Sequence, residues 1–339
     1  MLTGVFDLLT PQAAVQAVEQ AFDLTLDGMV FPYPSYVNRV YGLRSDEGTE
    51  LIAKFYRPER WTREAVEEEH RFVTECAAAD IPVVAPLPDP DGDTVGELVV
   101  DDREREENFL FALYPKKGGR NFDAEEDDHW FRLGAIVGRC HLVGRKQPAR
   151  HRLELSPELT FAYLDELLDE EVVHPDCRAE LDELCRSTLQ ALRPLFEGTG
   201  FQRIHGDCHR GNILERPGEG LLLIDFDDMM NAPPVQDLWL LLPDHAAECR
   251  RELTMMLEGY EQFVPFARDT LILIEPLRFM RIVYFLTWRA RQRHDHWFKR
   301  EHPHWGSKAF WLAEIEDLRS QRQVMVDEGT LAQDRPSSR

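Results

Sequence analysis

Two segments of the chain carry acidic and amide side chains at spacings that suit chemistry at a bound cation. The first reads IHGDCHRGNIL, from Ile204 to Leu214, and contains Asp207 followed five residues later by Asn212. The second reads LLLIDFDD and places Asp225 at the end of an apolar run, eighteen residues after Asp207. Mg²⁺ takes oxygen ligands and keeps several of its waters, so one Asp, one Asn and the oxygens of a phosphate group form a sufficient site.

These three side chains match the needs of phosphoryl transfer. The protein must position the nucleophile, neutralise the charge on the phosphate and accept a proton from the attacking hydroxyl. We predict that Asp207 accepts the proton and that Asn212 and Asp225 hold the metal ion, with Asp207 and Asp225 as the catalytic carboxylates. Protein kinases separate their catalytic Asp and metal-binding Asn by the same distance and continue with Asp-Phe-Gly. Here Asp227 stands where that Gly would be.

Other interpretations of the first segment are open. His205 and His209 flank Asp207 at alternate positions, which suits a metal-dependent hydrolase, but no second His/Asp cluster of similar density lies upstream. Cys208 is a candidate nucleophile with a neighbouring histidine as base, although sequence neighbours rarely have the required geometry. A polar loop with a purely structural role is the third alternative. We favour phosphoryl transfer because it also employs Asp225.

Composition and charge limit the environment of the protein. The 339 residues are 43% hydrophobic and 30% charged, and the longest apolar runs are interrupted by Arg, Asp or Pro, so we predict no membrane span. The formal charge of −23 disfavours binding to nucleic acid. The first residues lack the features of a signal peptide and the six cysteines form no CxxC pair, so we expect a cytoplasmic protein with reduced thiols. We also expect a monomer.

Strand and helix patterns place these segments within a chain of two parts. Residues 36–43 and 50–56 form a predicted hairpin, a helix is predicted over 62–79, and 108–115 is a predicted buried strand. The glycine pair in KKGGR then offers a flexible boundary between lobes. Beyond it short strands are expected only within 201–226, and the predicted helices span 127–144, 157–168, 177–196, 235–263, 270–293 and 308–326. A small β-rich lobe followed by a larger helical lobe suits an enzyme with a cleft.

Taken together, the motifs resemble those of a known family. IHGDCHRGNIL and LIDFDD resemble the catalytic and metal-binding signatures of the aminoglycoside phosphotransferase/choline kinase-like family, in which His-Gly-Asp stands in place of the His-Arg-Asp of protein kinases. The resemblance covers roughly residues 10–325 and is closest to a subgroup of bacterial Ser/Thr protein kinases. Further matching segments are SYVNRVY, KFYRPERWT, EEHRF, PVVAP, GGR, VQDLW and IEPLRFMRIVY.

The resemblance implies an α+β chain with a two-lobed protein-kinase-like fold. Residues 1–115 would form a small β-rich nucleotide-binding lobe, 116–326 a larger, mostly helical catalytic and substrate lobe, and 327–339 a disordered tail. It implies ATP and Mg²⁺ as cofactors, and transfer of the γ-phosphoryl group to Ser/Thr hydroxyls of proteins, including the kinase itself, in a stress response. The alternative acceptor is a small alcohol such as an aminoglycoside, choline or homoserine, and an acidic chain suits cationic acceptors.

The resemblance also implies a nucleotide site. Lys54, in the strand segment IAKFY, would contact the α- and β-phosphates and be held by a glutamate of the next helix, with Glu69 favoured over Glu68. No GxGxxG precedes Lys54. The hairpin segment PSYVNR takes the place of that loop, and Ser35 is expected to bind ATP there. The adenine ring would lie against residues 111–115.

Two further features of the second half bear on the site. Asp237, in VQDLW, resembles the aspartate that braces the catalytic loop in such kinases. Only eleven residues separate it from Asp225, too few for a long phosphorylatable activation segment. Arg278 and Arg281 lie three apart and therefore share a helix face, where they either point into the cleft or pair with carboxylates.

Overall fold

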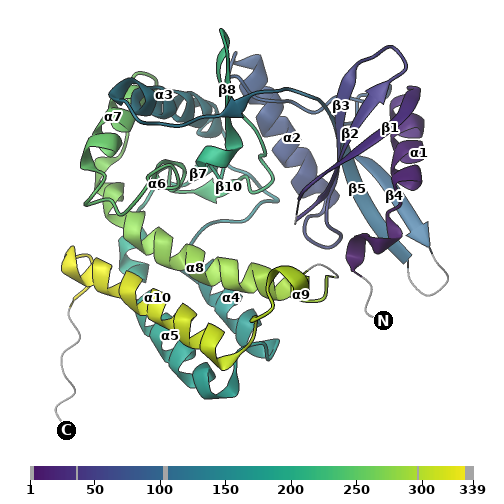
Figure 1. The fold of residues 1–339 in the computed structure, drawn as a ribbon. Helices are drawn as coiled ribbons and strands as arrows, with labels where there is room; N and C mark the ends of the chain where they lie inside the picture. The colour runs from purple at the N-terminus through teal and green to yellow at the C-terminus, as the bar shows by residue number, and fades with distance from the viewer. Residues whose placement is uncertain (1–3, 36, 102–105, 296–297, 333–339) are drawn as a thin grey trace.

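Five antiparallel strands form the first part of the computed structural model, which describes residues 4–35, 37–101, 106–295 and 298–332. Their order in the sheet is β1-β2-β3-β5-β4, and they span β1 (Leu26–Tyr33), β2 (Arg39–Ser45), β3 (Glu50–Phe55), β4 (Gly96–Asp101) and β5 (Glu106–Pro115). Helix α1 (Pro11–Phe22) packs against this sheet (Figure 1) around the buried rings of Phe55, Phe109 and Phe111. The pairing of β2 with β3 confirms the predicted hairpin.

Helix α2 (Arg63–Ala78) lies between the sheet and the rest of the molecule (Figure 1). The hydroxyl of Thr62 caps it by accepting a hydrogen bond from the N–H of Ala65, which satisfies one of the free donors of the first turn. Val66 packs in a small cluster with residues of the sheet, whereas Phe72 and Cys76 belong to the large hydrophobic core beyond it. The helix is therefore held from both sides, and its side chains reach the space between the two parts.

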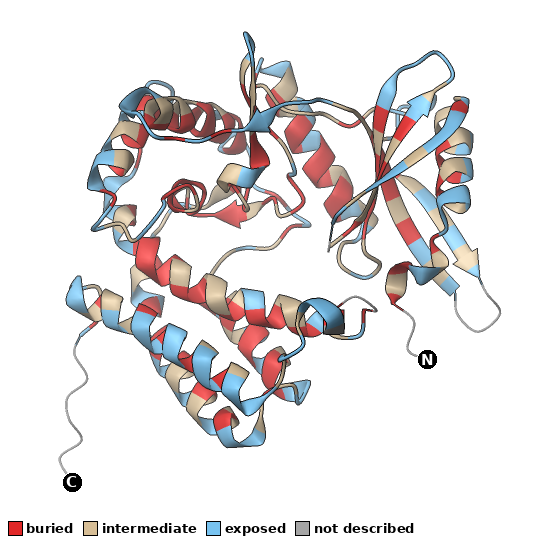
Figure 2. Cartoon of the chain, viewed as in Figure 1, coloured by how far each residue is buried: buried red, intermediate tan, exposed pale blue. Residues whose placement is uncertain are grey.

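The remainder of the chain is mostly helical. Its helices are α3 (Asp127–Gly144), α4 (Pro157–Asp169), α5 (Pro175–Phe196), α6 (Val235–Trp239), α7 (Arg250–Tyr260), α8 (Ile274–Arg291), α9 (Phe298–Glu301) and α10 (Lys308–Asp327). Short strands lie among them: β6 (Arg120–Asn121), β7 (Gln202–Ile204), β8 (Ile213–Arg216), β9 (Gly220–Leu223) and β10 (Met230–Ala232). Figure 2 shows the buried residues on the inward faces of these helices. The predicted two-lobed fold is confirmed.

One predicted helix is wrong. The pattern over 235–263 indicates a single helix, but the structure breaks it into α6 and α7, with an irregular connection from 240 to 249. Pro243 lies in this connection, and a proline removes a helical donor and disfavours helical backbone in the residue before it. The predicted helix over 270–293 likewise begins as a 3₁₀ segment, η3 (Arg268–Leu273), before α8. The break allows α7 to pack against α3 while α6 stays beside β7 (Figure 1).

The domain limits stay predictions. Strand β5 ends at Pro115, where the first lobe was expected to end, but α2 contributes to the large core of the second lobe. Of the tail expected to be disordered, Leu331 is buried, and residues 333–339 lie outside the described residues. Within the described ranges, no helix is both long enough and apolar enough to cross a membrane.

Helices α3 and α7 pack so closely that their backbones are in contact, at glycines on both helices. A Cβ on Gly134 would lie 1.8 Å from the carbonyl oxygen of Met256, and a Cβ on Gly259 would lie 2.0 Å from that of Phe131. Both distances are far below van der Waals contact. A backbone atom of a packed helix cannot move by itself, so a Cβ at either position would require the two helices to shift apart. The two helices therefore require glycine at these positions.

We predict that Gly134→Ala lowers the free energy of unfolding by about 1–3 kcal/mol, because α3 and α7 must separate to admit the methyl group. Gly118→Ala is the matched control, since a Cβ there meets no atom within 4 Å. Chemical denaturation of both variants measures the difference. Equal stability of the two variants would show that the helices shift apart without cost.

Candidate active site

The loop that follows β7 carries Asp207 and is fixed by its own backbone. Gly206 has a φ of +86°, which L side chains rarely adopt, and a Cβ there would lie 1.9 Å from the carbonyl oxygen of Asp228. Asn212 donates from its side-chain amide to the carbonyl oxygen of Asp207 at 2.9 Å, and its own N–H donates to the carbonyl of His209 at 2.9 Å. The loop thus closes on itself and brings Asn212 beside Asp207.

Asp237 holds this loop from α6. Its carboxylate is fully buried and accepts hydrogen bonds from the N–H groups of His205 and Gly206, at 2.8 and 2.9 Å. It also makes a 2.9 Å hydrogen bond with Nε2 of His141 on α3. The predicted bracing role of Asp237 is confirmed. A buried carboxylate needs hydrogen-bond partners for both of its oxygens. Asp237 therefore holds the loop in place, and the N–H groups of the loop in turn stabilise Asp237 on α6.

The histidines of the loop support it. Nε2 of His205 lies 2.9 Å from the carbonyl oxygen of Ile224, and Nδ1 lies 3.3 Å from the donating N–H of Asp207. Its ring packs against Phe226 with centroids 4.4 Å apart. Both ring nitrogens are therefore engaged with the backbone. In the part of the chain that the structure describes, no group of three or more His, Cys, Asp or Glu side chains is arranged to hold a metal ion, so no specific observation supports the hydrolase hypothesis.

Both carboxylate oxygens of Asp207 face cationic or potentially cationic groups. Oδ1 accepts a hydrogen bond from Nη2 of Arg281 on α8 at 2.6 Å, and Oδ2 lies 3.4 Å from Nε2 of His209. Burial acts to raise the pKa of Asp207, but the hydrogen bond from His209 and the charge of Arg281 outweigh it and hold the pKa below its usual range. These partners keep the carboxylate of Asp207 ionised, and they also weaken it as a proton acceptor while they remain bound.

Asn212 and Asp225 lie at neighbouring ends of the β8–β9 hairpin. The N–H of Ile224 donates to the carbonyl of Asn212 at 3.0 Å, which places Asp225 next to Asn212. Asp225 has a φ of 63°, and its carboxylate is 49% exposed. The amide of Asn212 donates to Asp207, which leaves its oxygen without a donor among the described residues. An exposed carboxylate and an available amide oxygen are ligands that suit Mg²⁺.

Lys54 projects from β3 to the acidic segment after β9. Its Nζ lies 2.7 Å from Oδ1 of Asp225 and 2.6 Å from Oδ1 of Asp227. Burial acts to lower the pKa of Lys54, but the charges of the two aspartates raise it well above its usual value. Asp227 also accepts a hydrogen bond from the side chain of Asn38 and lies 3.6 Å from Nη1 of Arg60. A lysine, an asparagine and an arginine of the first lobe therefore contact one carboxylate of the second lobe.

Glu69 does not pair with Lys54 in the described structure, where the lysine is bound by Asp225 and Asp227 instead. Glu69 is buried, lies 3.7 Å from Nη1 of Arg152 and has one oxygen without a hydrogen-bond partner. Burial raises the pKa of Glu69 to about 8. The fallback, Glu68, accepts hydrogen bonds from the N–H groups of residues 150–151 at 2.6 to 2.8 Å. The role of Glu69 in the nucleotide site stays a prediction.

Ser35 lies in the turn between β1 and β2. Its hydroxyl accepts a hydrogen bond from the N–H of Asn38 at 3.3 Å, and Asn38 in turn contacts Asp227. The turn is thereby linked to the acidic segment, while its neighbour Tyr36 lies outside the described residues. Sequence analysis assigned no role to Asn38 or Arg60, although both stand in the matching segments SYVNRVY and KFYRPERWT. No spacing rule relates Asn38 to an aspartate 189 residues away, or Arg60 to one 168 residues away.

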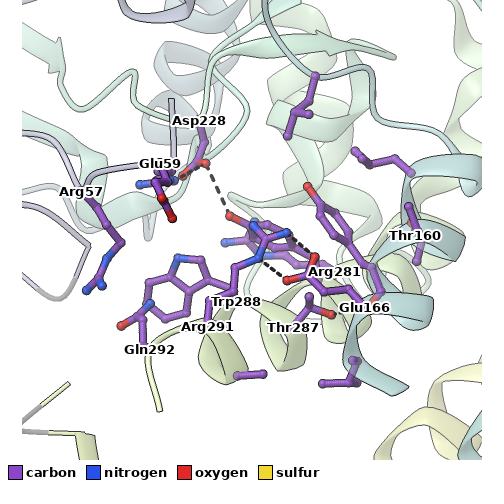
Figure 3. A pocket seen from close by; sticks show the side chains of 18 of the residues that line it. Arg57, Glu59, Thr160, Glu166, Asp228, Arg281, Thr287, Trp288, Arg291 and Gln292 are labelled. Carbon is purple, nitrogen blue, oxygen red and sulfur yellow. Dashed lines mark hydrogen bonds and ion pairs between the residues drawn. The ribbon is translucent and has the colours of Figure 1, made fainter. Parts of the chain in front are cut away.

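A cleft of about 950 Å³ opens beside the loop, lined by Gly206, Asp228, Arg281 and residues of α4 and α8. Figure 3 shows Arg291 and Glu166 joined within it. Four cleft arginines pair with four cleft carboxylates: Arg57 with Asp295, Arg60 with Asp228, Arg291 with Glu166 and Arg293 with Glu170. Arg281, which also lines the cleft, instead pairs with Asp207 in the loop after β7. Glu59 also lines the cleft, is exposed and makes no ion pair among the described residues, so four of the five cleft carboxylates are paired with arginines.

The two arginines of the α8 face have different partners. Arg278 lies 3.3 Å from the buried Glu275, donates to the carbonyl of Asp244 and lies over the ring of Trp239. The two predicted alternatives, pairing with carboxylates and pointing into the cleft, therefore both occur. Arg278 is held by structural partners, and Arg281 contacts the candidate base and lines the cleft.

Comparison with known proteins shows the family and the fold of the chain. Residues 32–271 match the phosphotransferase enzyme family. The chain is 34% identical to stress response kinase A of Escherichia coli K12 over 95% of each chain, and 34% identical to serine/threonine protein kinase RdoA of Salmonella typhimurium LT2 over 94% of each. Among solved structures, the amicoumacin kinase hAmiN in complex with AMP-PNP, Ca²⁺ and Ami has the same fold, with a TM-score of 0.70, 18% identity and coverage of 95% of this chain and 94% of its own. The chain belongs to the phosphotransferase enzyme family, and the protein is a kinase of that family.

Proposed function

We propose that the protein transfers the γ-phosphoryl group of ATP to Ser/Thr hydroxyls of proteins, including its own, with Mg²⁺ as the metal ion. The observation that carries the proposal is the carboxylate of Asp207 beside a cleft arginine, in a loop that is bonded to Asn212, which the β8–β9 hairpin in turn holds beside Asp225. The names of the relatives, a stress response kinase and a serine/threonine protein kinase, support a protein acceptor and a role in a stress response, which we propose takes place in the cytoplasm.

Each side chain of the site has a task in this reaction. The acceptor hydroxyl loses its proton to Asp207 while its oxygen forms a bond to the γ-phosphorus and the bond from that phosphorus to ADP breaks. Asn212 and Asp225 would hold Mg²⁺, which neutralises charge on the phosphate oxygens. Lys54 would bind the α- and β-phosphates, and the turn that contains Ser35 would donate hydrogen bonds to phosphate. Nucleotide phosphates must then compete with Asp225 and Asp227 for Lys54.

The charges of the acceptor cleft favour a protein hydroxyl as the acceptor over a polycationic small molecule. Although the chain carries a net charge of −23, four of the five carboxylates that line the cleft are paired with arginines, and only Glu59 is left without an ion pair among the described residues. A polycationic acceptor such as an aminoglycoside gains most from several unpaired carboxylates, and four of the five here would first have to leave their arginines. A small-molecule acceptor is the second candidate, because a cleft of about 950 Å³ is large enough for one and the structurally similar hAmiN was solved with Ami.

Labelled ATP separates the two acceptors. We expect the purified protein with Mg²⁺ to label itself, a generic Ser/Thr protein substrate and proteins of a cell lysate. A parallel reaction measures ATP consumption with an aminoglycoside, choline or homoserine. Consumption of ATP with one of these alcohols, without labelling of any protein, would replace the protein-kinase proposal by the second candidate.

Asp207→Asn is expected to lower the rate of transfer by at least about a hundredfold, because the amide cannot accept the proton. The dissociation constant for ATP should change by less than about threefold, since Asp207 faces the acceptor cleft. Rapid-quench transfer assays and titration with a fluorescent ATP analogue measure the two quantities. Asp269→Asn, on the exposed surface of η3, is the control. Transfer by Asp207→Asn at more than a tenth of the normal rate would contradict the assignment of the base.

Asp225→Asn is expected to raise the Mg²⁺ concentration for half-maximal nucleotide binding by about tenfold or more, because it removes the charged ligand of the metal site. Asp228→Asn is the matched control, since Asp228 pairs with Arg60 and has no contact with Lys54 or Asn212 in the described structure. Nucleotide binding at graded Mg²⁺ concentrations provides the measurement. An unchanged Mg²⁺ requirement in Asp225→Asn would place the metal elsewhere.

A further inference from the structure

Arg281, which contacts the candidate base Asp207, has N–H groups that make no hydrogen bond to the described residues. Its Nη2 donates to Oδ1 of Asp207 at 2.6 Å, and its side chain is 26% exposed. A guanidinium group carries five N–H donors, and no other described residue accepts from Arg281. Arg281 also lines the cleft that contains Gly206 and Asp228, so this cleft lies beside the hydrogen bond to Asp207.

The same side chain also lines a second hollow. A groove of about 700 Å³ lies between α8, α10 and α6, and its charged lining is formed by His245, Arg278, Arg281, Arg289, Glu314 and Asp317. Arg278 is held by Glu275, and Arg289 lies 3.9 Å from Glu314. Arg281 differs from both, because its carboxylate partner is the candidate base rather than a structural group. Arg281 lines both the groove and the cleft.

We propose that Arg281 is a specificity-determining residue that binds an anionic group next to the acceptor hydroxyl, so that the kinase prefers Ser or Thr flanked by Asp or Glu. The inference rests on the proposed protein-kinase function and names its substrate class. Consecutive Cα atoms are about 3.8 Å apart, so a carboxylate one or two residues from the hydroxyl reaches a guanidinium that touches Asp207. Planar pairing of carboxylate and guanidinium would fix the orientation of the acceptor chain.

Binding of this kind also frees the base. In the structure both oxygens of Asp207 are approached by protein groups, Arg281 on one side and His209 on the other. A flanking carboxylate accepts from the guanidinium and weakens its hold on Oδ1, which leaves that oxygen able to accept the hydroxyl proton. A flanking lysine would instead be repelled by Arg281. A purely supporting role for Arg281 would affect all acceptors alike, because holding Asp207 does not depend on the flanking residue.

Three peptides with one Ser and flanks of Asp, Asn or Lys test the proposal. We expect wild-type kcat/KM to fall in that order, with a ratio of at least about ten between the Asp and Lys peptides. In Arg281→Met the ratio should fall to about two or less, mainly through a higher KM for the Asp peptide. Arg281→Lys keeps the charge without the planar fork and should retain part of the ratio. Arg289→Met, about 12 Å further along α8, removes the same charge and should leave the ratio intact.

The outcomes separate this inference from the proposed function. Phosphorylation of the peptides with no preference for Asp in the wild type, or with a ratio unchanged in Arg281→Met, overturns the inference and leaves the protein-kinase function standing. An equal fall in kcat for all three peptides assigns Arg281 to support of Asp207 alone and also overturns it. If the wild type labels no peptide and no protein, the proposed function fails, and the inference with it. Because the wild-type ratio needs no variant, poor folding of Arg281→Met does not remove the test.

Discussion

The buried carboxylate of Asp237 is the constraint on which the active site depends. It accepts hydrogen bonds from two consecutive N–H groups of the loop before Asp207 and pairs with His141 on α3. An ionised group without contact with water is tolerated only when its oxygens are fully paired, so the loop cannot leave Asp237 without a large cost in free energy. The position of Asp207 thus follows from the packing of α3 and α6, and its rigidity needs no ligand.

The acidic segment after β9 joins the two lobes. Asp225, Asp227 and Asp228 receive cations from the first lobe, with Lys54 shared by the first two and Arg60 bound to the third at 2.7 Å. The aspartate in place of the usual glycine supplies the most buried of these contacts. In the proposed function, nucleotide phosphates would therefore replace protein carboxylates around Lys54, instead of filling a site that lacks negative charge.

Local charge governs recognition more than the net charge of the chain. A charge of −23 suggests cationic acceptors, but four of the five carboxylates that line the cleft are paired with arginines. Charges in contact at a partly buried site interact far more strongly than distant surface charges, which salt screens beyond about 10 Å. The arginine next to Asp207 is thus a stronger guide to the acceptor than the composition of the surface.

The sequence by itself determined the chemistry and the elements that carry it. Asp207, Asn212 and Asp225 lie in two short segments whose spacing reflects local backbone geometry, and the hairpin of β2 and β3 and most helices follow from local periodicity. Tertiary structure alone decided the partners of Lys54, the contact of Arg281 with Asp207 and the break between α6 and α7. Which carboxylate a flexible lysine or arginine reaches depends on packing between segments up to 173 residues apart, and no local pattern encodes that distance.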